Sequence, residues 1–239
     1  SKIKAYQSKD VLQNEKGLDK YIDKILNERS RKEMKKLLFI ILMTLPFVGV
    51  GQTFKEIQEL ANQKYNNGDY YGQITELSKI IDNDPEYAKN HMVYYLRGCS
   101  KQLLNDYNGA LKDYSLEGKI FADLEKRKAE CFYRLGEYKK TIVHCNKALE
   151  IYNDYDTAYF FRGLAKYKLK DLYGSVADFT SAINIKTEEG SFSYDDHSYY
   201  FRGLAKEKIG DTNGACNDWK KAVTLGYQDA SKLVTEKCN

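Results

Sequence analysis

Cysteines and histidines are the residue types through which this 239-residue chain could carry out redox, nucleophilic or metal chemistry. Two pairs of its five cysteines are candidates for disulfide bonds. Cys216 and Cys238 can meet if the end of the chain folds back, and Cys131 and Cys145 can meet across a pair of neighbouring helices. Burial as small side chains in tight helix contacts is the alternative for both pairs. Cys99 is left over, and no cysteine has the sequence context of a nucleophile.

The remaining candidate residues indicate no catalytic centre. The three histidines, His91, His144 and His197, are far apart and lack the spacing of metal ligands. The acidic stretch Asp195-Asp196 lacks the regularly spaced oxygen ligands of a calcium loop. The chain contains no glycine-rich phosphate loop and no nucleophile motif. The sequence therefore predicts no metal, no cofactor and no enzymatic activity.

The positive charge of the chain is concentrated near its beginning. The formal net charge is +4, and residues 1–51 carry eleven Lys or Arg against six Asp or Glu, a balance of +5. The rest of the chain has 27 basic and 28 acidic residues, so it is close to neutral. Nucleic-acid binding depends on a basic face that displaces counterions. The even balance argues against a nucleic-acid partner.

Residues 34–51 have the pattern of a secretory signal peptide. Met34 and two lysines precede an apolar run, and small residues stand at the end, so cleavage after Gly51 is expected. The protein is therefore predicted to be exported, periplasmic or secreted. The alternative is a membrane anchor formed by residues 37–51, and a membrane contact is expected only if this segment is retained. Residues 1–33 form a charged extension without a motif, and translation is expected to start naturally at Met34.

A duplicated segment organises the rest of the chain. Tyr159–Ala182, YFFRGLAKYKLKDLYGSVADFTSA, returns at Tyr199–Ala222 as YYFRGLAKEKIGDTNGACNDWKKA. Self-similarity of this length indicates a repeat architecture, in which each unit buries its apolar face only against its neighbours. The repeats are predicted to fill residues 52–227, and residues 228–239 are predicted to form an amphipathic helix that caps the stack.

The repeat pattern divides into five helical hairpins. Their approximate limits are 54–87, 91–120, 122–153, 156–190 and 196–227. Each hairpin has a turn dipeptide between its two helices, and these are Gly68-Asp69, Asn105-Asp106, Gly136-Glu137, Lys170-Asp171 and Gly210-Asp211. Each second helix then carries two packing residues three positions apart: Leu77/Ile80, Tyr114/Glu117, Cys145/Ala148, Phe179/Ala182 and Trp219/Ala222.

One pair of residues changes together between the repeats. Wherever the first helix carries Arg-Gly, an aspartate follows sixteen residues after the arginine, and wherever the arginine is missing the aspartate is missing too. Residues that change together between copies of one unit are expected to touch. We therefore predict an ion pair between the two helices of three hairpins: Arg97 with Asp113, Arg162 with Asp178, and Arg202 with Asp218.

These residues give the chain a resemblance to the tetratricopeptide repeat (TPR) family, whose 34-residue unit pairs two antiparallel helices. The resemblance covers about three quarters of the chain. It implies an all-α, right-handed superhelical solenoid and a protein that mediates assembly or adaptor work in the envelope of a Gram-negative-type bacterium. The third unit departs from the pattern because Ala129 replaces the packing glycine, and only the first unit has the expected proline, Pro85.

The resemblance also implies a binding surface, because in TPR proteins the first helix of each unit lines a concave groove. Aromatic and cationic side chains on these helices suit an extended protein or peptide segment with acidic groups. A glycan or cell-wall ligand stacked on the aromatics is the alternative. About half of the aromatics are expected to belong to the core instead. The candidate ligand-binding residues are Tyr65, Tyr95, Tyr133, Arg134, Phe160, Tyr167, Lys168, Tyr200 and Lys208.

Overall fold

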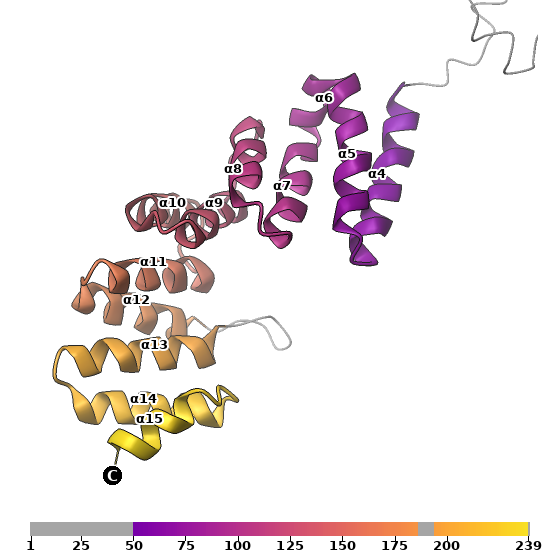
Figure 1. Ribbon diagram of the computed structural model, residues 1–239. Coiled ribbons are helices and arrows are strands. Elements are labelled where there is room, and N and C mark those ends of the chain that lie inside the picture. The colour runs from indigo at the N-terminus through magenta and orange to yellow at the C-terminus, as the bar shows by residue number, and fades with distance from the viewer. Residues whose placement is uncertain (1–49, 186–193, 239) are drawn as a thin grey trace, which may run out of the picture. The chain divides into compact units, whose positions relative to one another are not determined.

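The computed structural model describes residues 50–185 and 194–238, and every regular element in these ranges is an α-helix (Figure 1). Residues from Phe54 onward form one compact unit. The helices are α4 (Val50–Asn66), α5 (Tyr70–Asn83), α6 (Pro85–Asn90), α7 (Val93–Leu103), α8 (Tyr107–Leu116), α9 (Ala122–Arg134), α10 (Tyr138–Ile151), α11 (Asp156–Lys168), α12 (Leu172–Asn184), α13 (Asp195–Lys208), α14 (Thr212–Thr224) and α15 (Ala230–Lys237).

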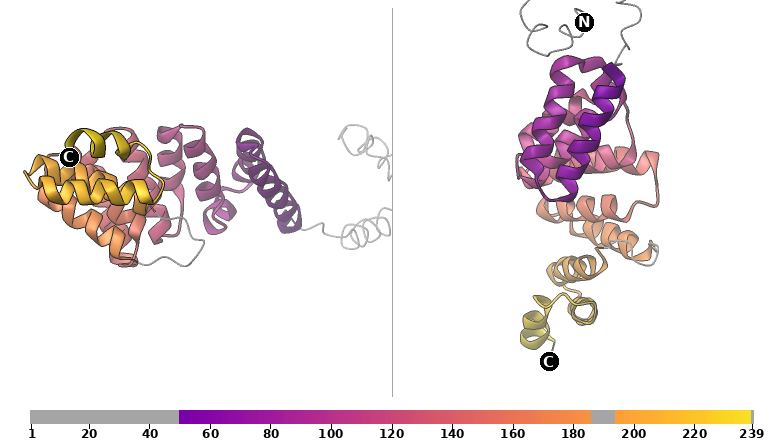
Figure 2. Two further views of the ribbon diagram at one scale, coloured as in Figure 1. Left: turned by 90° about the horizontal axis from the view of Figure 1, so that it is seen from below. Right: turned by 90° about the vertical axis from the view of Figure 1, so that its right-hand side faces the viewer.

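Ten of these helices form the five predicted hairpins, α4/α5, α7/α8, α9/α10, α11/α12 and α13/α14. The second helix of each hairpin is followed by the first helix of the next, and α5 contacts α7, α10 contacts α11, and α12 contacts α13 (Figure 2). The last helix, α15, packs on α14 as the predicted cap. The short helix α6 is an addition that the repeat pattern does not contain. It begins at Pro85, and the Asp84 carboxylate caps it by accepting a hydrogen bond from the Tyr87 amide.

The turn dipeptides have a uniform structure in all five hairpins. The first residue of each has a left-handed backbone with φ from 63° to 89°, and these residues are Gly68, Asn105, Gly136, Lys170 and Gly210. The second residue is the N-cap of the second helix. In four hairpins it is an aspartate that accepts a hydrogen bond of 2.8–3.0 Å from the amide of a glycine three residues later. The third hairpin differs, because Glu137 makes no capping bond.

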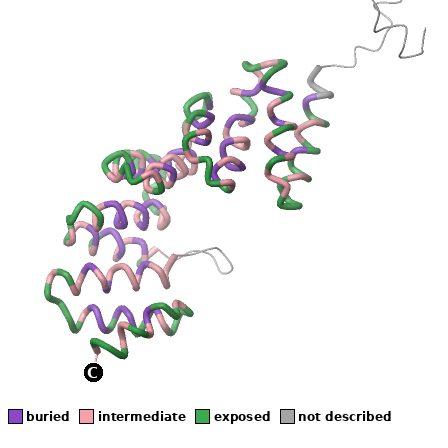
Figure 3. The backbone as a smooth tube through the Cα atoms, in the orientation of Figure 1, coloured by how far each residue is buried: buried purple, intermediate pink, exposed green. Residues whose placement is uncertain are grey.

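A small residue on each first helix faces a larger core residue on the second helix, sixteen positions later. In three hairpins a glycine lies directly against an aromatic ring, and a Cβ added to Gly203 would lie 2.5 Å from Nε1 of Trp219. The buried residues accordingly gather where helices face one another (Figure 3). The five pairs are Ala61/Leu77, Gly98/Tyr114, Ala129/Cys145, Gly163/Phe179 and Gly203/Trp219, and all the second-helix members are buried. This register is the one that the sequence predicts.

First helices of successive units also contact one another: α7 contacts α9, α9 contacts α11, and α11 contacts α13. Second helices within the described ranges make no contacts of similar extent with each other. The first helices therefore share one side of the stack, which we call the inner face.

The predictions for residues 1–33 and for most of the signal segment 34–51 lie outside the described residues. The described part reaches this segment only at Val50, where α4 begins. Among the described helices, none combines the length and apolar character needed to span a bilayer.

Candidate interaction face

The predicted ion pairs between the helices of three hairpins are confirmed, and each is bidentate. In every pair Nε of the arginine lies 2.9 Å from Oδ2 of the aspartate, and Nη2 lies 2.7 Å from Oδ1. The three aspartates Asp113, Asp178 and Asp218 are at most 4% exposed. A lysine one turn after each arginine adds a second cation at 2.8–2.9 Å. A buried carboxylate needs this degree of compensation, so the pairs hold the register of the hairpin.

Each of these arginines also reaches the preceding unit. Nη1 of Arg97 donates to the Ser78 hydroxyl at 2.9 Å, and Nη1 of Arg162 donates to Oδ1 of Asn146 at 2.7 Å. Nη1 of Arg202 lies 3.1 Å from the Thr180 hydroxyl. One guanidinium therefore joins three helices, two from its own hairpin and one from the hairpin before it.

The third hairpin replaces the Arg–Asp pair by a different set of groups. Its carboxylate comes from Glu125, one turn before the arginine position, and is 3% exposed. Glu125 accepts from Nζ of Lys128 at 2.9 Å and lies 2.7 Å from Nδ1 of His144. Burial alone would raise the pKa of Glu125, but the hydrogen bonds from His144 and Lys128 lower it to about 2. In the third hairpin, Glu125 of α9 and His144 of α10 thus link the two helices in place of the Arg–Asp ion pair.

The predicted ligand-binding residues divide into exposed, half-buried and buried groups on the first helices. Arg134, Lys168, Lys208 and Tyr65 are exposed. Phe160 is only 4% exposed and stacks on Tyr194 with ring centroids 4.5 Å apart, so it belongs to the core and offers no surface to a ligand. The other four predicted aromatics are half-buried: Tyr95, Tyr133, Tyr167 and Tyr200.

The three exposed cations occupy the same position in three successive units, the last residue of the first helix. Arg134 and Lys168 are the last residues of α9 and α11, and Lys208 is the last residue of α13. No carboxylate within the described residues forms an ion pair with any of them. The alternative explanation is that they only stabilise the negative ends of their helices. Lys208 also contacts the first helix of the preceding unit, because its Nζ lies 5.8 Å from the centre of the Tyr167 ring on α11.

Tyr95 belongs to a polar network that the sequence reasoning missed. Its hydroxyl donates to the Asp123 carboxylate, which also accepts from the Tyr155 hydroxyl at 2.8 Å and from Nε of Arg127 at 2.8 Å. Burial acts to raise the pKa of Asp123, but Lys126 and Arg127 outweigh it and hold this pKa below its usual range. These groups satisfy one another, so Tyr95 serves to connect α7, α9 and the start of α11. The spacing of Asp123 and Arg127 by one helical turn was the available sequence signal.

A second group of tyrosines lies at the end of the inner face. Tyr167 and Tyr200 come from α11 and α13, and Tyr227 precedes the cap helix. The rings of Tyr200 and Tyr227 have centroids 4.7 Å apart and are tilted by 40°. Burial, with a smaller effect of the Glu207 carboxylate, raises the pKa of Tyr167. Glu207 itself forms an ion pair with Lys237 of the cap.

The structure decides between the alternatives for the cysteines. Cys216 and Cys238 form a disulfide, with sulfur atoms 2.06 Å apart. Cys131 and Cys145 are free and buried, and they pack into different apolar clusters. Burial raises the pKa of both thiols to about 12. Cys99 is also a buried free thiol with a raised pKa. These three thiols therefore lack the character of nucleophiles.

Comparison with solved structures places the fold among known repeat proteins. MamA from Desulfovibrio magneticus RS-1 matches with a TM-score of 0.62 and 18% identity over 74% of this chain and 97% of that one. YrrB, described as a TPR protein with an unusual peptide-binding site, matches with a TM-score of 0.58 and 16% identity over 71% and 84% of the two chains. PilW, a type IV pilus biogenesis factor, matches with a TM-score of 0.59 and 17% identity over 76% and 79%.

No protein-family model matches this chain, and no curated protein matches it at a significant level. The likeness to these solved structures therefore concerns the fold. Together with the all-helical hairpins and their common turns, it shows that the chain has the tetratricopeptide repeat fold.

Proposed function

We propose that this protein is a non-catalytic scaffold that binds an extended, acidic segment of a partner protein along its inner face. One observation carries the proposal: the exposed cations Arg134, Lys168 and Lys208 stand at the ends of three successive first helices and lack carboxylate partners within the described residues. Solvated ion pairs with a partner would use these charges, whereas the half-buried arginines of the hairpins are already paired.

The tyrosines next to this row supply the apolar part of the surface. Tyr133 precedes Arg134, and Tyr167 precedes Lys168, so two successive units each present one half-buried ring and one cation. Tyrosine rings lose little conformational entropy on binding and combine apolar area with a hydroxyl group. A segment that crosses the units would meet the same pair of groups at each of them.

The disulfide supports the further proposal that the protein works outside the cytoplasm. Disulfides persist in the periplasm and the extracellular space and are rare in the cytosol. This agrees with the export predicted from residues 34–51.

A glycan ligand remains the weaker alternative, because its expected feature is a platform of parallel exposed rings. The ring pairs that involve Tyr133 and Tyr200 are tilted or edge-to-face, with interplanar angles from 40° to 77°.

Photo-crosslinking tests the proposed surface without assuming the identity of the partner. A photoreactive phenylalanine analogue replaces Tyr167 on the inner face or, as a matched control, Tyr173, which is 75% exposed on the second helix α12. We expect a discrete protein adduct in cells from position 167 and none of the same mass from position 173.

The charges are tested in the same assay. The triple variant Arg134→Gln, Lys168→Gln, Lys208→Gln should lose the adduct. The control Lys112→Gln, Lys147→Gln, Lys220→Gln removes three exposed cations from second helices and should keep it. Equal adducts from positions 167 and 173, or a triple inner-face variant that crosslinks like the wild type, would contradict the proposal.

A further inference from the structure

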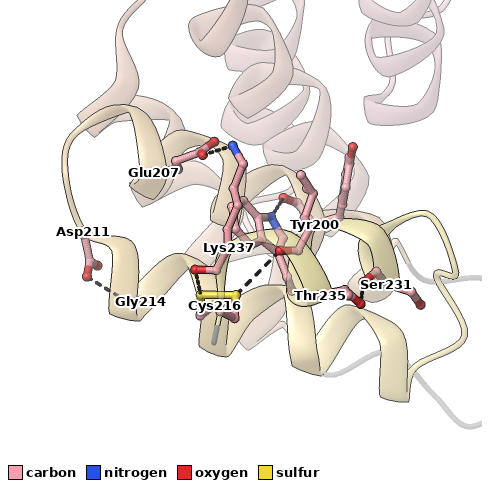
Figure 4. The surroundings of a disulfide bond; sticks show 11 residues. Tyr200, Glu207, Asp211, Gly214, Cys216, Ser231, Thr235 and Lys237 are labelled. Carbon is pink, nitrogen blue, oxygen red and sulfur yellow. Dashed lines mark hydrogen bonds and ion pairs between the residues drawn. A yellow bond between two sulfur atoms is a disulfide. The ribbon is translucent and has the colours of Figure 1, made fainter.

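The cap helix α15 is attached to the last hairpin by two side-chain links at its end. Cys238, directly after the helix, is bonded to Cys216 of α14, and the neighbouring Lys237 pairs with Glu207 of α13 (Figure 4). The rest of its contact is apolar, with Ala230 buried and Leu233 and Val234 partly buried. The helix has eight residues, which is too short for an isolated helix to be stable in water. Its place on the stack therefore depends on these links together with the apolar contact.

The link through Lys237 affects the charge of the inner face. Glu207 precedes Lys208 on α13, and its carboxylate acts on the phenol of Tyr167, on which Lys208 also lies. With the cap in place, Lys237 neutralises Glu207. Without the cap, one unpaired carboxylate would stand beside the row of cations.

We propose that the Cys216–Cys238 disulfide controls the affinity of the inner face for acidic segments, by holding Lys237 against Glu207. This inference rests on the proposed function. Reduction by a dithiol transfers two electrons and two protons to the bond, gives two cysteine thiols, and leaves the reductant as a cyclic disulfide. The end of α15 is then released, and the Glu207 carboxylate repels an acidic partner. The oxidised protein is the form that binds.

One residue of the cap, Lys237, carries the charge that faces Glu207. A cap that acted only by stabilising the last hairpin would give a redox response in binding that did not depend on the charge at position 237. In the proposed mechanism the effect on binding depends on the positive charge of Lys237. A substitution at this position removes the charge and leaves the disulfide intact. The other exposed lysine of the helix is Lys232, whose one ion pair within the described residues is with Glu236 of the same helix, at 3.8 Å, so it provides a matched control.

The test is fluorescence anisotropy of the full chain with a fluorescein-labelled decapeptide of alternating glutamate and glycine, at low ionic strength. Wild-type protein is compared in its oxidised form and after reduction with a dithiol, with the thiol content measured in each sample. We expect reduction to weaken binding by about three- to tenfold, the effect of one partly exposed charge. Lys237→Met should bind as weakly as the reduced wild type and should not respond to reduction. Lys232→Met should behave like the wild type.

A rescue variant separates charge from loss of structure. Glu207→Gln removes the carboxylate, so its reduced form should bind at least as well as the oxidised wild type. Equal affinity of oxidised and reduced wild type, or a redox response retained in Lys237→Met, would overturn the inference while the crosslinking result for the inner face stands. Absence of peptide binding in both redox states would also overturn it, and crosslinking from position 167 would then show whether the scaffold function itself fails.

Discussion

At the scale of single residues, the protein repeats a small set of paired side chains and varies them together. Where the first helix has glycine, the facing residue of the second helix is aromatic, and where it has alanine, the facing residue is Leu77 or Cys145. The volume of one partner limits the volume of the other because the helices are in close contact. The third hairpin varies both its packing pair and its ion pair, since Ala129 and Glu125 occur together.

The packing pairs predict the effect of a single added methyl group. Gly203→Ala should destabilise the protein by about 1–3 kcal/mol, because its Cβ would lie 2.5 Å from the Trp219 ring and the packed ring has little room to move. Gly163→Ala should cost less, because the corresponding distance to Phe179 is 3.0 Å. Urea denaturation followed by circular dichroism gives both values. A Gly203→Ala protein as stable as the wild type would show that the helices can separate freely.

The carboxylate of Glu125 predicts a pH dependence of stability. Its pKa is lowered from the ordinary value of 4.5 to about 2 in the folded protein, so its contribution is fully present above about pH 4.5 and is lost as the pH falls toward 2. The free energy of unfolding should therefore fall less steeply across this range in Glu125→Gln than in the wild type. Denaturant titrations at pH 2.5, 3.5, 4.5 and 6 make the comparison. Identical slopes for the two proteins would rule out the proposed stabilisation of the ionised form.

At the scale of the element, four of the five second helices start with the same capping arrangement. An aspartate at the N-cap accepts from the amide of a glycine three residues later, and a Cβ on that glycine would lie 1.9–2.3 Å from the aspartate carboxylate oxygen. The aspartate and the glycine therefore go together. The third hairpin has neither, and Glu137 instead pairs with Lys140 at the glycine position, with the charged atoms 2.6 Å apart.

This capping arrangement predicts unequal effects of two similar substitutions. Asp211→Ala removes a cap bond of 2.8 Å and should cost about 1 kcal/mol of stability. Glu137→Ala removes an exposed ion pair and no cap bond, so its cost should be below about 0.5 kcal/mol. Thermal and urea unfolding of both variants test the difference. Equal costs would mean that the capping bond contributes little.

At the scale of the whole molecule, a stack of repeats confines the effect of a local change to its neighbours. The cap helix contacts α14 and reaches α13 through Lys237, and among the described residues its contact with α14 is its one extensive helix contact. Loss of the disulfide should therefore loosen the end of the stack and leave its beginning unchanged.

Hydrogen exchange tests this confinement. In Cys238→Ser, amides of α15 and of the end of α14 should exchange at least about tenfold faster, because local opening no longer has to break a covalent link. Amides of α5 and α7 should exchange at the wild-type rate. Uniformly faster exchange over all hairpins would indicate that the stack unfolds as one unit and that the cap stabilises all of it.

Much of this structure was predictable from the sequence because its determinants are local. The five hairpins, their turn dipeptides and the ion pair of Arg202 with Asp218 follow from comparing copies of one unit, in which the packing pairs and the Arg–Asp pairs stand sixteen positions apart. A short, constant separation closed by a tight turn leaves few possible arrangements. The short helix α6 was not predictable in this way, because no other connector between hairpins contains a helix in the described residues.

Only the tertiary structure decided which residues meet across units and through irregular connectors. It placed Phe160 in the core and Arg134 on the surface, although both lie on first helices with similar patterns. It joined Cys216 to Cys238 and left Cys131 and Cys145 apart, and it brought Lys237 to Glu207. These outcomes depend on how each hairpin packs on the next, which is set by the shapes of several side chains at once and is not encoded in the spacing of any two residues.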